Sequence, residues 1–417
     1  MFIISVSVSY VFAQSNVLTI EQCSEMALKN NPQIKIAEGT RDYNSSSVVS
    51  TRSALLPQVS FSGGWARNGG TTILGKNEFT GSYETYSTGF SAQQLIFDFG
   101  KTYSKLNAAA YTSDAAELDY QTARQTLLLS VQSAYYGYLQ ALKLRDVNAE
   151  LEKQAEEHLA QAKGLFDVGK KPQFDVMKAQ TDLANAKLNF IKAENTVRLN
   201  KLQLENVLNQ KLPKDVTVQD DFGMSKPDIS LEDAYATAMT NRPEIAAGRN
   251  KVDATKSMVT SAWTANLPAI NATGGYNWKG FALDQKLNPS WNLGVTLSLP
   301  IFQGFALDAG LDQARANLKI AEGQNESVIQ SVKLDVEQQF SNVIEAKERI
   351  DASKLLVTQA EETFRLADAR YKEEVGSPIE ITDAEATLLN AKTSFIQANY
   401  DFSLAYARLN KAMGVLK

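Results

Sequence analysis

The chain has 417 residues and a net charge of −5 at pH 7, from 42 Lys and Arg against 47 Asp and Glu. The basic residues are spread along the sequence, which excludes the basic patch typical of nucleic-acid-binding proteins. A single cysteine and a single histidine exclude a disulfide framework and almost every metal or catalytic site built from these residues. We therefore expect no enzymatic activity, no cofactor and no metal, and we expect His158 to be exposed among its polar neighbours.

Residues 1–13 (MFIISVSVSYVFA) form a short apolar run before Gln14. The run resembles the apolar part and cleavage site of a secretory signal whose basic start is missing, so we expect the true start upstream of Met1. It is too short for a membrane-spanning helix, which needs about 20 apolar residues. Cys23 is expected to be a small core residue, because the three residues before it are not the small apolar run that lipid attachment requires.

The sequence contains an internal duplication. Residues 19–34 (TIEQCSEMALKNNPQI) return as residues 230–245 (SLEDAYATAMTNRPEI) at an offset of 211, and residues 97–204 match residues 302–409 at an offset of 205 without a gap. A period near 200 residues is far too long for a solenoid and indicates one structural unit present twice. The expected division is a first repeat at 14–211, a linker at 212–229 and a second repeat at 230–417.

Each repeat is predicted to contain one very long helix and one helix that returns. No proline occurs between Pro57 and Pro172 or between Pro300 and Pro378. At 1.5 Å per residue the long helix measures about 100 Å, which a compact domain cannot bury, so we expect a coiled-coil-like tube or bundle. The expected helices are 101–167 and 174–209 in the first repeat, and 305–375 and 380–413 in the second.

The returning helices are only about half as long as the outgoing ones. Shorter helices expected near 32–56 and 243–266 have the length to make up the difference. We therefore expect each short helix to be stacked end to end with a returning helix. The chain ends at Lys417 soon after the last helix, so no C-terminal extension is expected.

Strands are predicted before each long helix, at 58–66, 86–95, 270–278 and 291–299, with exposed loops at 67–85 and 279–290. Large apolar residues alternate with Gly, Ser, Asn and Gln in these segments. A length of about ten residues and this alternation match transmembrane β-strands. An ordinary half-buried antiparallel sheet shows the same period, but its polar face would contain Lys and Glu. The residues expected to face lipid are Phe61, Trp65, Tyr86, Phe90, Tyr276, Trp278, Trp291 and Leu293.

Four strands cannot close a barrel, because about eight is the practical minimum. An open sheet edge cannot be left in lipid. The barrel and the helical tube must therefore be assembled from several chains, and two, three or four copies all remain possible on these grounds.

The chain resembles the outer-membrane efflux channels of the TolC family over nearly its whole length. The features of this resemblance are the segment LTIEQCSEMALKNNPQI at 18–34, the strand-to-helix corners at 95–100 and 300–304, and VGSPIEITDAEATLLNAKTSF at 375–395. The resemblance implies a mainly α fold with transmembrane β: a homotrimer with a 12-stranded β-barrel in the outer membrane of a Gram-negative bacterium, continuous with a periplasmic α-helical barrel. A mixed belt is expected at Leu212–Ser230.

By the same resemblance, the function is that of a passive exit duct in a tripartite efflux or type I secretion system. The implied partners are a periplasmic adaptor (membrane fusion) protein, an inner-membrane RND, ABC or MFS transporter, and outer-membrane lipid. The alternative is a soluble periplasmic coiled-coil scaffold or adaptor, whose strands would form an ordinary small domain. The transported substrate is open on sequence alone.

The resemblance also places an acidic periplasmic gate at Glu380 and Asp383, with Asp175 at the corresponding place in the first repeat. Glu380 and Asp383 are three residues apart, so both carboxylates can face the same side of a helix. The competing interpretation is that acids near a helix start oppose its dipole. The turns differ in sequence, since glycine precedes Asp175 by six residues and Glu380 by four. The tips expected to contact the adaptor are Gly169, Lys170, Gly376 and Ser377, where each glycine permits a close helix approach or a left-handed turn.

Overall fold

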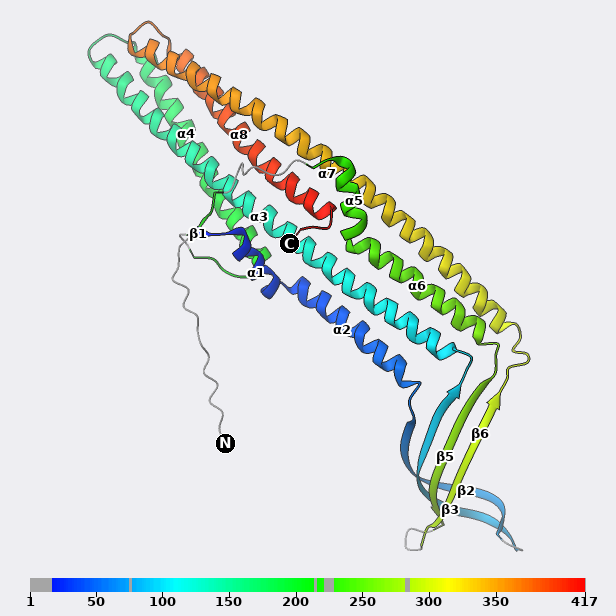
Figure 1. Ribbon diagram of the computed structural model, residues 1–417. Helices are drawn as coiled ribbons and strands as arrows, with labels where there is room; N and C mark the ends of the chain where they lie inside the picture. The colour runs from blue at the N-terminus through cyan, green and yellow to red at the C-terminus, as the bar shows by residue number, and fades with distance from the viewer. Residues whose placement is uncertain (1–16, 75–76, 214–215, 221–228, 282–285, 417) are drawn as a thin grey trace, which may run out of the picture. The chain divides into compact units, whose positions relative to one another are not determined.

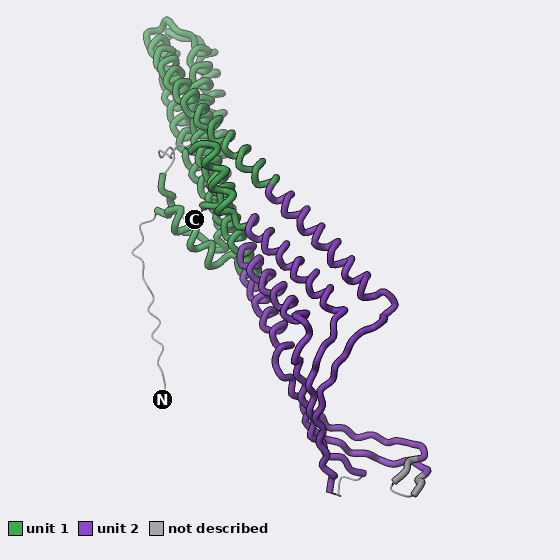
Figure 2. Tube along the Cα trace, turned by 45° about the vertical axis from the view of Figure 1, so that its right-hand side comes forward, with its two compact units in different colours: residues 1–37, 120–243, 330–417 green, residues 38–119, 244–329 purple. Residues whose placement is uncertain are grey.

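The computed structural model describes residues 17–416 except 75–76, 214–215, 221–228 and 282–285 (Figure 1). The expected signal segment and much of the expected linker lie outside these residues. The chain divides into two compact units, and both repeats contribute to each (Figure 2). Unit 1 comprises Met1–Ala37, Tyr120–Pro243 and Gln330–Lys417, and unit 2 comprises Glu38–Asp119 and Glu244–Ile329.

The element order repeats in the two halves of the chain (Figure 1). The first half contains β1 (Val17–Leu18), α1 (Ile20–Asn30), α2 (Pro32–Ser53), β2 (Gln58–Leu74), β3 (Asn77–Phe97), α3 (Lys101–Asp167), α4 (Gln173–Leu208) and β4 (Thr217–Val218). The second half contains α5 (Leu231–Asn241), α6 (Pro243–Thr264), β5 (Ala269–Gly280), β6 (Asn288–Ser298), α7 (Ala306–Lys372) and α8 (Pro378–Ala412). This is the duplicated unit of two strands, a long helix and a returning helix that the sequence predicts.

The long helices α3 and α7 are both 67 residues long. Helix α7 ends at Lys372, three residues before the predicted end, because the chain leaves the helical region at Glu374, whose φ is +67°. A residue with positive φ cannot continue a right-handed helix.

Short and returning helices meet end to end, as the sequence predicts. At the start of α2, the Asn31 side chain donates a hydrogen bond of 2.8 Å to the Val207 carbonyl near the end of α4. At the start of α6, Arg242 donates to the Ala412 carbonyl at the end of α8, at 3.2 Å. Each junction therefore satisfies a carbonyl in the last turn of a returning helix, where no intrahelical donor is available.

The core of unit 1 lies where α1, α3 and α4 meet the short strands. Strands β1 and β4 form a parallel pair in which Val17 is opposite Thr217. The Tyr135 hydroxyl of α3 donates to the carbonyls of Leu18 at 3.2 Å and Gln219 at 2.9 Å. The described part of the expected belt is thus attached to the middle of α3.

Cys23 belongs to this core and is completely buried. Burial raises the pKa of its thiol to about 12. Cys23 is therefore a small apolar core residue, as the sequence predicts.

Unit 2 contains an antiparallel sheet with the strand order β2-β3-β5-β6 among the described residues (Figure 1). The prediction of a loop over 67–85 is wrong, because the β2–β3 ladder continues from Arg67 opposite Glu84 to Leu74 opposite Asn77. Polar cross-strand pairs stabilise this extension, including a 3.0 Å hydrogen bond between the hydroxyls of Thr71 and Thr80. In the predicted loop 279–290, Lys279 likewise pairs with Asn288.

Candidate functional site

The strand register places all eight residues that were expected to face lipid on one face of the sheet. Residues directly opposite in an antiparallel ladder share a face, and every second residue along a strand does so too. One such row consists of Phe61, Phe90, Tyr276 and Trp291. We call this surface the aromatic face; the expected members are Phe61, Trp65, Tyr86, Phe90, Tyr276, Trp278, Trp291 and Leu293.

The aromatic face is uncovered by the rest of the chain. Trp291 is 75% exposed and Leu293 is 79% exposed. The rings contact one another, with centroid distances of 5.0 Å for Phe61 and Phe90 and 4.7 Å for Tyr276 and Trp278. Such a continuous exposed apolar surface is unusual on a water-soluble monomer and indicates contact with a membrane or another protein.

The opposite face of the sheet is small and polar. The hydroxyls of Ser60 and Ser91 form a hydrogen bond of 2.8 Å across β2 and β3. The Asn277 side chain lies over Gly89 so closely that a Cβ at this position would overlap it. One face of the sheet is therefore suited to an apolar surrounding and the other to water.

The helix turns of the two repeats have equivalent backbones. Residues 168–172 connect α3 to α4, and residues 373–377 connect α7 to α8. The left-handed residue is the second of each turn, Gly169 with φ +74° and Glu374 with φ +67°. The different spacing of the glycines therefore does not reflect a different turn.

The two glycines serve different purposes. Gly169 permits the left-handed conformation, whereas Gly376 permits a close approach to the end of α7. A Cβ on Gly376 would lie 2.9 Å from the Tyr371 main-chain nitrogen and 3.0 Å from the Arg370 carbonyl carbon. The Gly376 nitrogen also donates to the Arg370 carbonyl at 2.9 Å.

The other expected tip residues stabilise the turns. Lys170 forms an ion pair of 2.6 Å with Glu374 and so connects the turn of one repeat to that of the other. Ser377 precedes α8, and its hydroxyl accepts a hydrogen bond of 3.2 Å from the Ile379 nitrogen. Lys170 remains 55% exposed despite its partner, so the tip surface is accessible in the single chain.

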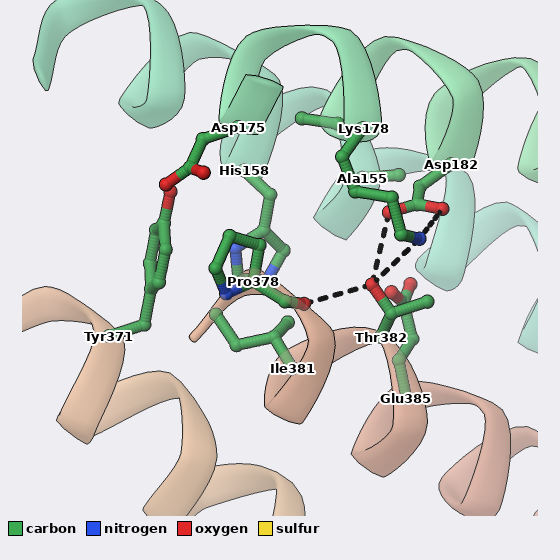
Figure 3. Close-up of a pocket in the computed structure, with 11 residues that line it drawn as sticks. Ala155, His158, Asp175, Lys178, Asp182, Tyr371, Pro378, Ile381, Thr382 and Glu385 are labelled. Carbon is green, nitrogen blue, oxygen red and sulfur yellow. Dashed lines mark hydrogen bonds and ion pairs between the residues drawn. The ribbon is translucent and has the colours of Figure 1, made fainter. Parts of the chain in front are cut away.

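The three acids expected at the gate do not form one cluster. Glu380 is exposed and accepts from the Arg370 guanidinium at 3.1 Å. Asp383, also on α8, is exposed. Asp175 is only 5% exposed, and its carboxylate points toward the Tyr371 hydroxyl (Figure 3). Burial, followed by the charge of Asp175, raises the pKa of Tyr371.

This difference has a cause in the repeat itself. Asp175 and Glu380 are equivalent at the offset of 205, but only Asp175 is covered, by Tyr371 of the second repeat. The residue equivalent to Tyr371 is Phe166, at the end of α3. Phe166 is 42% exposed, so the equivalent contact is missing within one chain.

A polar network links the two returning helices beside the turns (Figure 3). Thr382 of α8 donates to Asp182 of α4 at 3.0 Å, and Lys178 of α4 contacts Asp182 at 2.5 Å and Thr382 at 3.2 Å. A pocket next to the network is lined by residues from α3, α4, α7 and α8 and the turn before α8, among them Ala155, His158, Asp175, Tyr371, Ile381 and Glu385.

The expectation that His158 is exposed is wrong. Its ring lies in this pocket (Figure 3) and packs edge-on against Phe364 at 6.3 Å between centroids. Its Nδ1 atom is buried without a hydrogen-bond partner among the described residues. Burial is the main cause that lowers the pKa of His158.

Sequence reasoning missed Glu385, whose pKa is raised to about 7 by burial and by the Asp182 carboxylate. A signal was present, because Glu385 and Thr382 lie on one side of the apolar stripe of α8, and Glu380 and Asp383 lie on the other. The residues of this stripe are buried against α7: Ile381, Ala384, Leu388 and Ala391.

None of the described helices has an apolar stretch long enough to cross a membrane. A two-faced sheet leading into paired helices of 67 residues is the architecture of an outer-membrane export channel. The sequence matches the family model described as outer membrane efflux protein over residues 23–210 and 234–415, and the chain belongs to this family. It is an outer-membrane protein of a Gram-negative bacterium.

Known proteins similar to this chain agree. It is 26% identical to the outer membrane protein TolC of Vibrio cholerae, covering 94% of this chain and 89% of the relative. It is 25% identical to TolC of Escherichia coli K12, covering 99% and 86%. The solved outer membrane channel CmeC of Campylobacter jejuni is similar in fold, with a TM-score of 0.85, 20% identity and coverage of 96% and 86%.

Proposed function

We propose that three copies of this chain form a passive duct through the outer membrane, coupled to an inner-membrane pump by a periplasmic adaptor. The observation that most supports this is the aromatic face on a sheet whose outer strands, β2 and β6, each have one unpaired edge among the described residues. An open edge is not tolerated in lipid. Pairing β6 of one copy with β2 of the next removes every edge, and three copies give 12 strands.

The helices provide a second argument for assembly. Exposed apolar residues recur every 11 residues on α4, at Met177, Leu188 and Leu199. They recur at the same spacing on α7, at Ile344, Leu355 and Leu366. An 11-residue period corresponds to 3.67 residues per turn and favours long-range packing of helices in a right-handed sense. We propose that these two stripes pack against neighbouring copies and close the helical tube.

The gate belongs to the same proposal. In a closed trimer the uncovered Phe166 of one copy would cover Glu380 of the next, as Tyr371 covers Asp175 within a chain. Glu380 and Asp383 of three copies would then place six carboxylates around the tube axis, a field that favours cations and resists anions. Asp175 would act from inside the wall, by holding the turns of the two repeats together, rather than in the lumen.

The accessible tip residues Gly169, Lys170, Gly376 and Ser377 would meet the adaptor. The pump would be an RND, ABC or MFS transporter, and the polar inner face of the sheet suits small hydrophilic or amphipathic cargo. Relatives whose names include antibiotic and toluene efflux pumps favour the export of small molecules. A soluble periplasmic scaffold is the competing function, because it would need the same helices but no lipid contact.

The experiment combines fractionation with conductance. The duct should be recovered in outer membranes and run as a trimer in detergent, whereas recovery as a soluble periplasmic monomer would exclude it. In planar bilayers, Glu380→Ala with Asp383→Ala should weaken block by a trivalent cation about tenfold, because most of the lumenal charge is lost. The matched control is Glu362→Ala, an exposed acid of α7 paired with Arg365. Unchanged block in the double variant would assign both acids to the helix dipole.

A further inference from the structure

Both strand-to-helix corners contain a phenylalanine in the left-handed region. Phe99 has φ +55° and is followed by Gly100 at +87°, whereas Phe305 has φ +65° and is preceded by Gly304 at +60°. At the offset of 205, Phe99 matches Gly304 and Gly100 matches Phe305, so the two corners share two left-handed positions with the residues in opposite order. Left-handed φ is strained for a bulky side chain but free for glycine.

The strain is not explained by packing. Phe99 is 46% exposed and Phe305 is 72% exposed. Each ring has one aromatic neighbour, Phe97 at 4.7 Å in the first corner and Phe302 at 5.5 Å in the second. We call these the corner pairs. Strain that persists at an exposed residue indicates that the side chain has a role outside the fold.

Nor do the helix starts require these rings. The Asp98 carboxylate accepts from the Thr102 nitrogen at 2.8 Å, which satisfies one of the free donors at the start of α3. In the second corner the Gln303 carbonyl accepts from the Ala306 nitrogen at 3.2 Å. The caps come from the residues next to the phenylalanines, so glycine at both left-handed positions would preserve them.

A β-bulge directs the first corner pair to the aromatic face. Leu95 is opposite Asn271 on the polar face, and the next paired residue is Phe97, opposite Ile270 on the aromatic face. Ile96 is the additional residue. Because side chains alternate along a strand, this insertion moves Phe97 from the polar to the aromatic face.

The position of the corners along the strand matches a membrane boundary. From Tyr86, at the far end of the aromatic face, to Phe97 are 11 residues of β3. At 3.4 Å per residue and a tilt of about 45° these residues span about 26 Å. The apolar band of an outer-membrane barrel is about 25 Å tall and is bounded by aromatic residues on both sides.

We propose that the corner pairs Phe97–Phe99 and Phe302–Phe305 insert at the headgroup–acyl boundary of the periplasmic phospholipid leaflet, and that the strained conformation is retained to present them there. The proposal rests on the outer-membrane duct above. In a trimer the two corners give six pairs around the barrel. Amphipathic interfacial positions favour aromatic rings over glycine, which accounts for a phenylalanine in each corner.

The test uses single spin labels in phosphatidylethanolamine–phosphatidylglycerol vesicles, in a Cys23→Ala background. Labels at Phe99→Cys and Phe305→Cys should be reached by oxygen more than by a water-soluble nickel complex, at a shallower depth than a label at Leu293→Cys. Labels at Tyr111→Cys and Ile320→Cys, exposed apolar positions farther along α3 and α7, should report water.

The outcomes are distinct. Labels in the aqueous phase at positions 99 and 305, with position 293 in lipid, would overturn this proposal and leave the duct intact. Water at position 293 as well would overturn the duct. Labels at 99 and 305 that neither reagent reaches would show burial against a second copy or another protein, which also excludes the lipid contact.

A second measurement tests the role of the strain. The combined variant Phe99→Gly, Phe305→Gly should insert into these vesicles with an apparent equilibrium constant reduced about tenfold per lost ring, as expected for losing half of a buried phenylalanine. Its thermal unfolding temperature in detergent should not fall. Phe99→Trp with Phe305→Trp is the matched control and should insert normally. Full insertion of the glycine variant would overturn the proposal.

Discussion

Thr382 of α8 donates a hydrogen bond of 3.0 Å to the Asp182 carboxylate of α4, so a direct side-chain bond joins the two repeats beside the helix turns. Lys178 contacts the same carboxylate at 2.5 Å. The lysine and the aspartate are only 27% and 22% exposed, so the network is screened less than a surface ion pair. Its position next to the turns means that separating the hairpins requires breaking it.

Removing the carboxylate should weaken the contact between the hairpins. Asp182→Ala leaves the Lys178 ammonium half-buried without its partner, and we expect a loss of about 2 kcal/mol of stability. In a double-mutant cycle with Thr382→Val, the coupling energy should be about 1 kcal/mol. Chemical denaturation in detergent measures both. Additive effects of the two substitutions would show that the bond contributes nothing.

The same region should respond to pH through Glu385. Its folded-state pKa is about 7, above the model value of 4.5, because of burial and the Asp182 charge, opposed by Lys178. Its contribution to stability is therefore fully present below about pH 4.5 and is lost as the pH rises through about 7. The thermal unfolding temperature of Glu385→Gln should depend less on pH between 5 and 8 than that of the wild type. His158, whose pKa is lowered, acts in the opposite direction, because its protonation destabilises the fold as the pH falls.

The turn glycines should differ in their tolerance of alanine. Gly376→Ala places a Cβ 2.9 Å from the Tyr371 nitrogen, a backbone atom that cannot rotate away, and should cost about 1–3 kcal/mol. Gly169→Ala meets no atom within 4 Å and should cost only the left-handed strain, about 1–2 kcal/mol. Protease susceptibility of the tip would separate them further, since only Gly376→Ala should open the turn. Equal susceptibility would contradict the close-approach interpretation.

The belt should depend on one hydroxyl. Tyr135→Phe removes the donor to the Leu18 and Gln219 carbonyls without changing the ring packing, and should cost about 1–3 kcal/mol. Hydrogen exchange at Leu18 and Gln219 should accelerate, while exchange within α8 stays unchanged. Uniform acceleration across unit 1 would mean that the tyrosine supports the whole core rather than the belt.

The two faces of the sheet should respond differently to charge. Leu293→Arg on the aromatic face should reduce insertion stability by about 2–4 kcal/mol if it lies near the bilayer centre. Asn292→Arg, the adjacent residue on the polar face, should cost much less and should instead change ion selectivity. Urea-dependent folding into vesicles and bilayer conductance measure the two effects. Equal costs would contradict the assignment of faces.

Periodicity in the sequence was sufficient for much of the fold. The alternation in 58–66 and the proline-free stretch after Pro57 come from local chain geometry, which a single sequence records directly. The side-chain faces followed too, since all eight strand residues share one face. Strand ends did not follow, because the Gly- and Thr-rich extension beyond Arg67 is stabilised by cross-strand pairs that composition alone does not reveal.

The tip was predicted less well. Asp175 and Glu380 are equivalent in the sequence, and nothing local shows that only Asp175 lies under Tyr371. Burial of His158 and the raised pKa of Glu385 likewise depend on residues about 200 positions away. Contacts between repeats decide these positions, and a repeat pattern conceals them because it presents both halves as alike.

The equivalent turns also determine the symmetry that a partner encounters. In the proposed trimer, six tips have one main-chain path, since the second residue of each turn is left-handed in both repeats. Their chemistry alternates, with Gly169 and Lys170 in one tip and Glu374 and Val375 in the next. A partner that recognises main-chain shape therefore meets a sixfold ring, whereas one that distinguishes side chains meets a threefold one.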